Sequence, residues 1–129
     1  MEKNYPPENL PLFVAAQEDD VKTINELLAA GANPNETNDG GYTPLHIAAR
    51  NGAVGAVELL CTKVANINAQ GHDGDTALYY AARSGSLKAV KALLDHGADP
   101  SIVNERGETA RSIAEDHGHK DIVALLDEL

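Results

Sequence analysis

Apolar residues recur along this chain at steps of three and four residues, and polar or charged residues fill most positions between them. This spacing places apolar groups on one face of an α-helix. The pattern therefore predicts short amphipathic helices whose apolar faces must pack against one another. The two clearest sets are Val54, Val57, Leu60 and Cys61, and Leu87, Val90, Leu93 and Leu94.

The same pattern returns after 33 residues, without an insertion. The segment Thr43–Ala49, with the sequence TPLHIAA, aligns with Thr76–Ala82 and with Thr109–Glu115. Four units in this register fill the chain from about Leu10 to Leu129. A period of this size is typical of a solenoid, in which no unit buries its apolar face alone. We therefore expect an all-α repeat solenoid of stacked helix-turn-helix units.

The repeated segments predict a short first helix in each unit. Thr43 and its equivalents stand where a hydroxyl caps the first turn. The pair Ala48-Ala49 puts small side chains at one level of the helix, which permits close approach of a neighbouring helix. Asn38–Gly41 and Asp73–Asp75 are typical of tight turns, because Gly tolerates positive φ and Asn or Asp bonds its own backbone.

These motifs resemble the ankyrin repeat family over roughly 120 of the 129 residues. Thr43–Ala49 matches the family's helix-opening motif, and Gly31–Pro34 and Gly97–Pro100 match its exit from helix to loop. The resemblance implies an L-shaped stack in which each repeat has two antiparallel helices and an outward loop with a β-turn or hairpin. It also implies a recognition scaffold with no catalytic residues and no cofactor. The domain would span residues 1–129, with repeats at about 10–40, 41–73, 74–106 and 107–129.

Charged residues in the last unit bear on the ends of the stack. Arg111, Glu115 and Asp127 stand where the middle units have apolar residues. Charges at these positions would be costly beneath another repeat, whereas a terminal repeat needs a polar outer face. We therefore expect a complete protein of four repeats, in which the first and last act as caps.

Composition narrows the class of partner. With 20 acidic and 10 basic residues, the net charge of -10 disfavours nucleic acid and anionic membranes and favours a protein partner with a basic or mixed-charge surface. The single cysteine fits a reducing compartment. No apolar run of about 18 residues occurs, and Met1–Pro11 lacks a signal-peptide core. We therefore expect a cytoplasmic protein, acting as a monomer.

The resemblance places the binding surface on the loop tips and on the exposed edge of the first helices. There, acidic residues alternate with arginines and tyrosines, and Tyr and Arg are enriched among residues that carry binding energy. Turn chemistry alone also explains each acid. The predicted residues are Asp39, Tyr42, Arg50, Asn51, His72, Asp73, Asp75, Tyr79, Arg83, Ser84, Glu105, Arg106, Glu108, Asp116 and His117, with Gln17 and Glu18 extending the row into the first repeat.

Two tyrosines have alternative interpretations. Tyr79 takes the position of His46, which in the ankyrin family braces neighbouring loops through hydrogen bonds, so both a structural and a binding role stay open. Tyr80 aligns with Ile47 and Ile113, which favours a place in the core. For Tyr42, the binding role is favoured.

The second repeat departs from the others at two positions. Val64 stands where Gly31 and Gly97 follow their helices, so either the helix ends differently or the turn is strained by about 1 kcal/mol. Gly55 lies within the second helix and weakens it by up to about 1 kcal/mol relative to Ala. We therefore expect local opening to begin in this repeat.

Catalytic and metal-binding patterns find little support. Cys61 aligns with Leu28 and Leu94 and is interpreted as a core thiol. His117 and His119 lack a third ligand nearby, and His46 stands where an EF-hand loop needs Glu. Two functions remain open: a protein-binding adaptor or scaffold, and a dedicated inhibitor that occludes an enzyme.

Overall fold

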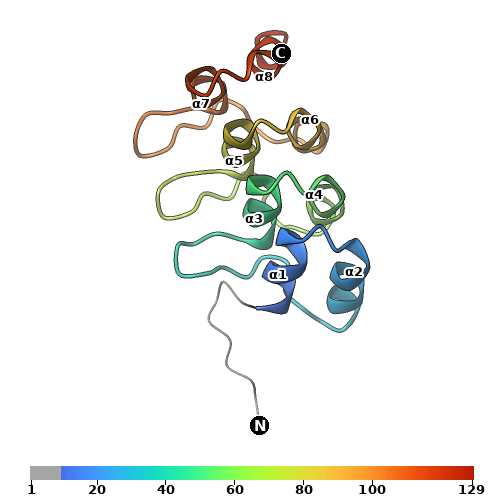
Figure 1. Cartoon of the computed structure of the whole chain (residues 1–129). Coiled ribbons are helices and arrows are strands. Elements are labelled where there is room, and N and C mark those ends of the chain that lie inside the picture. Colours follow the sequence, from blue (N-terminus) through green and yellow to red (C-terminus); the bar gives the residue numbers. More distant parts are fainter. Residues whose placement is uncertain (1–9) are drawn as a thin grey trace.

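The computed structural model describes residues 10–129, which form eight α-helices in four antiparallel pairs, numbered here repeats 1 to 4 (Figure 1). The first helices of the pairs are α1 (Pro11–Gln17), α3 (Pro44–Arg50), α5 (Ala77–Ser84) and α7 (Ala110–Asp116). The second helices are α2 (Val21–Ala29), α4 (Val54–Cys61), α6 (Leu87–Asp95) and α8 (Lys120–Asp127).

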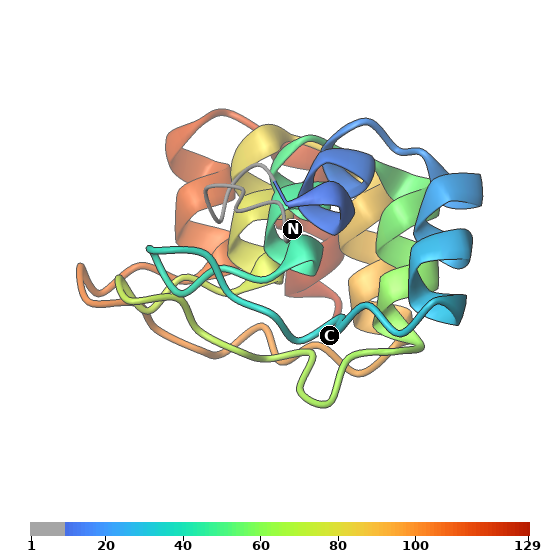
Figure 2. The same ribbon diagram turned by 90° about the horizontal axis from the view of Figure 1, so that it is seen from below.

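The helices form two layers, with the first helices stacked in one and the second helices in the other (Figure 1). Long loops leave the helix pairs at a steep angle and lie side by side beneath them, as Figure 2 shows. Residues 10–129 contain no β-strand, which confirms the all-α repeat fold. A β-turn closes each loop tip: the amides of Gly41, Gly74 and Gly107 donate to the carbonyl three residues earlier, at 3.0, 2.9 and 3.1 Å.

The core lies between the layers and combines small and branched side chains. The alanine pairs Ala48-Ala49 and Ala81-Ala82 are fully buried, so the first helices approach closely, as predicted. Leu60 and Leu93 of the second helices are also fully buried against them. Thr43 caps α3 as the sequence predicts, because its side chain accepts a hydrogen bond from the amide of His46, and Thr76 and Thr109 act likewise on α5 and α7.

The second helices differ in how their first turns are capped. Asp20 accepts a hydrogen bond from the amide of Thr23 at 3.1 Å in α2, and Ser86 accepts one from Ala89 at 3.2 Å in α6. The equivalent residue before α4 is Ala53, which has no side-chain oxygen. Repeat 1 supplies the missing acceptor: Asp19 Oδ1 lies 2.7 Å from the amide nitrogen of Ala56.

This bond across repeats explains the glycine at position 55. Asp19 occupies the position at which the other three repeats have Gly, and it adopts the same left-handed backbone, with φ 56°. Its side chain therefore points towards the next repeat. A Cβ built on Gly55 would lie 3.1 Å from Asp19 Oδ1 and 2.9 Å from Val21 Cγ2. Gly55 thus gives Asp19 room to cap α4.

The structure at the end of α4 decides between the two alternatives for Val64, a different helix end or a strained turn. Gly31 and Gly97 have φ values of 99° and 92° after α2 and α6, whereas Val64 avoids positive φ. Helix α4 ends at Cys61, one residue earlier in the register than α2 and α6, and the amide of Val64 donates to Leu60 O at 3.0 Å. The helix therefore ends differently, and the turn stores no left-handed strain.

The outer face of repeat 4 carries a cluster of ion pairs. Arg111 Nη1 lies 2.7 Å from Glu115 Oε2, and its other nitrogens donate to both carboxylate oxygens of Asp127. The charges that the sequence places on this face therefore neutralise one another in water, where such pairs contribute little to stability.

Candidate functional site

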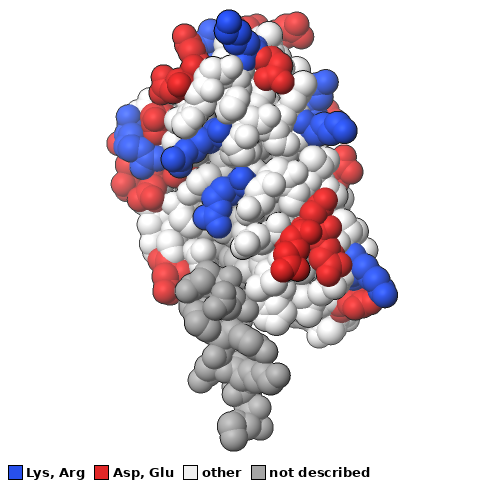
Figure 3. Space-filling view, viewed as in Figure 1, with Lys and Arg blue, Asp and Glu red and all other residues white. Residues whose placement is uncertain are grey.

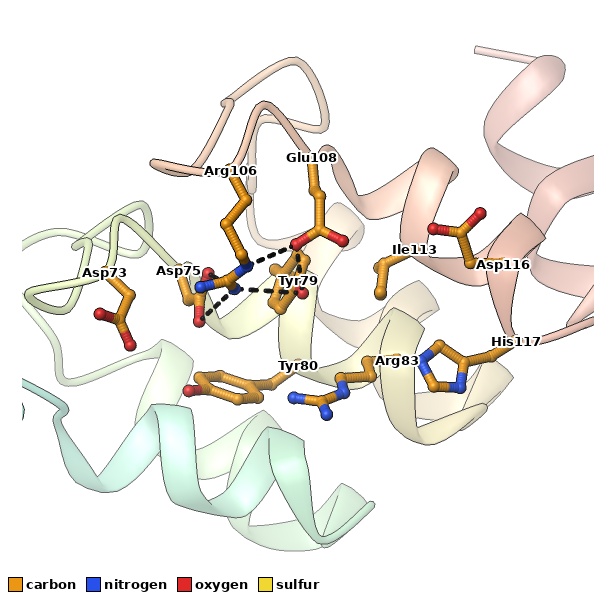
Figure 4. Close-up of a pocket in the computed structure, with 10 residues that line it drawn as sticks. All are labelled: Asp73, Asp75, Tyr79, Tyr80, Arg83, Arg106, Glu108, Ile113, Asp116 and His117. Carbon is orange, nitrogen blue, oxygen red and sulfur yellow. Dashed lines mark hydrogen bonds and ion pairs between the residues drawn. The ribbon is translucent and has the colours of Figure 1, made fainter.

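Two adjoining hollows mark the concave surface formed by the first helices and the loops. The larger, of about 550 Å³, lies between repeats 3 and 4 (Figure 4). The smaller, of about 360 Å³, continues towards repeat 2. Tyr80, Arg83 and His117 line both, so they stand at the junction. The other lining residues are Asp73, Asp75, Tyr79, Arg106, Glu108, Ile113 and Asp116 in the larger hollow, and Arg50 and Ser84 in the smaller.

A network of hydrogen bonds builds one wall of the larger hollow (Figure 4). Arg106 Nε donates to Glu108 Oε1 at 2.9 Å, and its Nη2 lies 3.2 Å from Asp75 Oδ1. Asn104 Nδ2 donates to the same two carboxylates, at 3.1 and 2.9 Å. Hydrogen bonds from Asn104, Arg106 and Tyr79 hold the pKa of Glu108 below its usual range. The loop between α6 and α7 is therefore fixed to repeat 3.

Two predicted binding residues lie inside this wall. Asp75 is only 3% exposed and Tyr79 only 4%, so little of either side chain is open to a partner, although both line the larger hollow. Neighbouring side chains cover both residues and bond their polar atoms. Asp75 binds Asn104 and Arg106, and the Tyr79 hydroxyl donates to Glu108 Oε1 at 2.9 Å. These contacts favour the structural interpretation of Tyr79.

His46 shows the equivalent brace one repeat earlier. Its Nε2 lies 2.9 Å from Ala69 O and 3.1 Å from Asp75 O, so Nε2 carries the proton, while Nδ1 accepts from the amide of Thr43 at 3.0 Å. Burial lowers the pKa of this imidazole, which keeps it neutral. Tyr79 is longer, and its hydroxyl reaches a side chain of the following loop.

Aromatic rings form the floor between the loops and the helices. The ring of Tyr42 packs edge to face on both His46 and Tyr80, with centroids 5.4 Å apart in each case. The hydroxyl of Tyr42 donates to Asp73 Oδ2 at 3.0 Å. Burial raises the pKa of Tyr42 and Tyr80, so both stay neutral. Tyr80 belongs to the core, as predicted, yet its 9% exposed surface also lines both hollows.

Exposed polar residues follow the ends of the first helices. Arg50 and Arg83 are exposed and form no ion pair with any of residues 10–129. In Figure 3, basic side chains lie over α3 and α5 in the middle of the view, and acidic ones lie along the loop edge and in a cluster near the turn between α1 and α2. Asn51 and Ser84 also bond their own helix carbonyls, and Asp116 and His117 complete the row on α7.

The loop tips form a second, connected row. The amide of His72 donates to Gly40 O at 2.8 Å, and that of Glu105 donates to Asp73 O at 3.0 Å. These bonds join neighbouring tips, so the exposed side chains at the tips are held in a fixed order. The exposed tip residues are Asp39, His72, Asp73, Glu105 and Arg106, while Tyr42 and Glu108 are partly exposed and Gln17 and Glu18 are exposed on repeat 1.

Sequence reasoning missed the contribution of Ile113 to the larger hollow and of Asp19 to the capping of α4. Asp19 carried a signal, because an acid replaces Gly in a register where the next repeat lacks a capping residue at Ala53. Ile113 gave no such signal, because its sequence position is typical of a core residue and its side chain is only 5% exposed.

The comparisons with known proteins agree with the repeat pattern. The family model described as ankyrin repeats, in 3 copies, matches residues 12–104. The search of curated proteins finds no match. Among the described residues, no helix has the length and apolar character needed to cross a membrane, and no group of three or more His, Cys, Asp or Glu is placed to hold a metal ion.

Proposed function

The chain belongs to the ankyrin repeat family, whose repeats generally mediate contacts between proteins, and on that premise we propose that it is a non-catalytic adaptor or scaffold. Its partner would bind on the concave surface and the loop tips. One observation carries the proposal: Tyr80, Arg83 and His117 meet where two hollows join, on the face that also presents Arg50 and Tyr42. Arg and Tyr supply large contact area and directional bonds at interfaces.

The rigidity of this surface supports the proposal. The wall of Arg106, Asp75 and Glu108 and the bonds between loop tips hold the exposed groups in place before a partner arrives. A surface that is already ordered loses little conformational entropy on binding, so more of the contact energy appears as affinity.

The charge of the surface supports a protein partner of basic or mixed charge. The rim carries Asp39, Asp73, Glu105 and Asp116, all exposed, and the net charge of the whole chain is -10. These charges repel the phosphates of nucleic acids and favour lysine and arginine side chains on a partner.

The environment of the Cys61 thiol supports a binding role in place of catalysis. Burial raises the pKa of Cys61 to about 11, so this side chain is protonated near neutral pH and is a weak nucleophile. It packs against the core on the second-helix layer, away from the concave surface. We propose a reducing compartment such as the cytoplasm for this chain, in keeping with a single unpaired cysteine.

Selection from a random peptide library displayed on phage tests the proposal. Peptides bound by the full chain would be mapped by heteronuclear NMR and measured again with a variant carrying Tyr42→Ala, Arg50→Ala and Arg83→Ala, shown by circular dichroism to be folded. We expect shifts confined to the concave surface and loss of binding in the variant. A control variant with Glu58→Ala, Lys88→Ala and Lys91→Ala on the second helices should keep binding. Shifts confined to the second helices would refute the proposal.

An identified partner then separates the two roles. If the partner is an enzyme, an adaptor leaves its activity intact, whereas an inhibitor abolishes it when the two proteins are mixed in equal amounts. We propose the adaptor.

A further inference from the structure

The ion pairs of the described residues divide the arginines into two groups. Arg106 pairs with Asp75 and Glu108, and Arg111 pairs with Glu115 and Asp127. Arg50 and Arg83 pair with no carboxylate among residues 10–129, although acids outnumber basic residues by 20 to 10 in the chain. The two unpaired arginines both lie on the concave surface.

Their positions place two guanidinium groups over one hollow. Arg50 ends α3, and Arg83 is the next to last residue of α5, one repeat later, so they occupy equivalent places on neighbouring first helices. Packed helices lie about 8–10 Å apart, so the backbones that carry the two arginines are separated by about this distance. Both line the hollow of about 360 Å³, with Tyr80, Ser84 and His117 as its other walls. In Figure 4, Arg83 extends between Tyr80 and His117.

The surroundings of the hollow have the opposite sign. Asp73 and Asp116 line the adjoining hollow and are exposed, and Asp39 and Glu105 continue the acidic rim along the loop tips. The concave surface is therefore positive in its middle and negative at its edges. A uniformly basic or uniformly acidic ligand matches only one of these zones.

We propose that this surface binds a short segment of a partner protein that has carboxylates at its centre and lysine or arginine on both flanks. The carboxylates lie on Arg50 and Arg83, whose planar guanidinium groups can each donate two parallel hydrogen bonds to a carboxylate. The basic flanks lie on the acidic rim. In the polyproline II conformation, which has three residues per turn and a rise of about 3.1 Å per residue, two glutamates three residues apart point to the same side and are separated by about 9 Å, close to the separation of the two helices. This inference rests on the proposed function and specifies the partner of the same surface.

Two peptides of identical composition test it. Both have blocked ends: Lys-Gly-Glu-Gly-Gly-Glu-Gly-Lys has its acids inside, and Glu-Gly-Lys-Gly-Gly-Lys-Gly-Glu has them outside. NMR titration of the full chain should show that the first peptide binds about tenfold more tightly, equal to about 1.4 kcal/mol, with shifts around Arg50 and Arg83. Equal affinities, a preference for the second peptide, or no binding of either would overturn the inference.

Charge reversal identifies the arginines as the cause. With Arg50→Glu and Arg83→Glu together, the order of the two affinities should reverse. Lys88→Glu and Lys91→Glu, both exposed on α6, change the net charge equally and should leave the order unchanged. A preference that survives the arginine reversals would overturn the inference, as would one that the lysine reversals abolish.

The phage library separates failure of this inference from failure of the proposed function. Selected peptides that map to the concave surface but lack central acids would overturn the inference and leave the adaptor proposal intact. Selected peptides that map elsewhere would remove both.

Discussion

Helices α4 and α6 occupy equivalent places in neighbouring repeats but are held at their ends by different means. Ser86 caps α6 from within its own repeat, and Gly97 follows α6 in the left-handed conformation. Helix α4 has neither feature, since Asp19 of repeat 1 caps its first turn and its last turn closes without a glycine. Equivalent helices of one fold can therefore depend on their neighbours to different degrees. In α4, a bond that repeats 1 and 3 make internally has become part of the interface between repeats.

The largest effect should be the same in both helices. Leu60 of α4 and Leu93 of α6 are fully buried at equivalent positions, so Leu60→Ala and Leu93→Ala should each cost about 2–5 kcal/mol in free energy of unfolding. Urea denaturation of the two variants checks this. Similar losses would confine the difference between the helices to their ends, whereas a much smaller loss at Leu60 would mean that the core of repeat 2 is also looser.

Removal of the cap from repeat 1 should have the next largest effect. Asp19→Ala deletes the acceptor for the Ala56 amide and forces a Cβ-bearing residue without local hydrogen bonds into positive φ, at a combined cost of about 2 kcal/mol. Asp19→Gly removes only the cap and should cost about 1 kcal/mol. Asp19→Asn keeps an acceptor and tolerates positive φ, so its midpoint in urea should match wild type. Equal stability of all three variants would contradict the proposed capping role.

Substitution by alanine at equivalent positions should affect the two helices differently. Gly→Ala within a helix ordinarily stabilises by about 1 kcal/mol. At Gly55 the new Cβ would meet Val21 Cγ2 and displace Asp19, so Gly55→Ala should destabilise by about 1 kcal/mol despite better helix propensity. Lys88→Ala at the equivalent exposed position of α6 should be nearly neutral. Thermal melts of both variants measure the difference, and a stabilised Gly55→Ala variant would show that the contact relaxes freely.

Hydrogen exchange should locate the weakness of repeat 2 at one end of α4. The sequence predicts earlier opening of this repeat, which stays a prediction. The structure narrows it, because the amide of Ala56 is held by Asp19, whereas the last turn lacks the glycine that follows α2 and α6. Amides of residues 59–63 should exchange faster than those of residues 92–96. Uniform protection across the repeats would contradict both the prediction from the sequence and the narrower prediction from the structure.

The smallest effect concerns pH. Hydrogen bonds from the hydroxyl and the amide of Thr23 lower the pKa of Asp20, the cap of α2. A carboxyl whose folded pKa is lowered stabilises the fold above its unfolded value of about 3.9, and this stability is lost as pH falls through the folded pKa. Protection of the Thr23 amide should therefore weaken below about pH 4, while that of Ala89, capped by the hydroxyl of Ser86, should not. Parallel loss at both amides would point to global unfolding.

The repeat register made most of the fold predictable from the sequence. Side chains that recur at fixed steps identify the helix pairs, and the positions of Thr43, Thr76 and Thr109 identify the caps of the first helices. Contacts between repeats were less predictable, because a local pattern does not say where a side chain at a turn points. Asp19 is the clearest case, since its effect is felt 37 residues later in the chain.

The candidate site was predictable as a surface but not as a set of contacts. The expected row of helix ends and loop tips is present, with Arg50, Arg83 and His117 exposed on it. Asp75 and Tyr79 were predicted as part of the same row but lie buried, because Arg106 and Glu108 of the following loop fold over them. Only the arrangement of two loops in space shows which of these charges are already paired.

The hydrogen bond from the Ala56 amide to Asp19 makes repeat 2 depend on repeat 1, and this dependence limits how the gene can be rearranged. Repeat 3 carries its own serine cap and its own glycine exit, so a copy of it could be inserted elsewhere in the array with its helix ends intact. Repeat 2 could not, because placed after a repeat with glycine at the turn it would lose the acceptor for α4 while keeping the glycine at 55. Repeats 1 and 2 would therefore have to be duplicated or moved together.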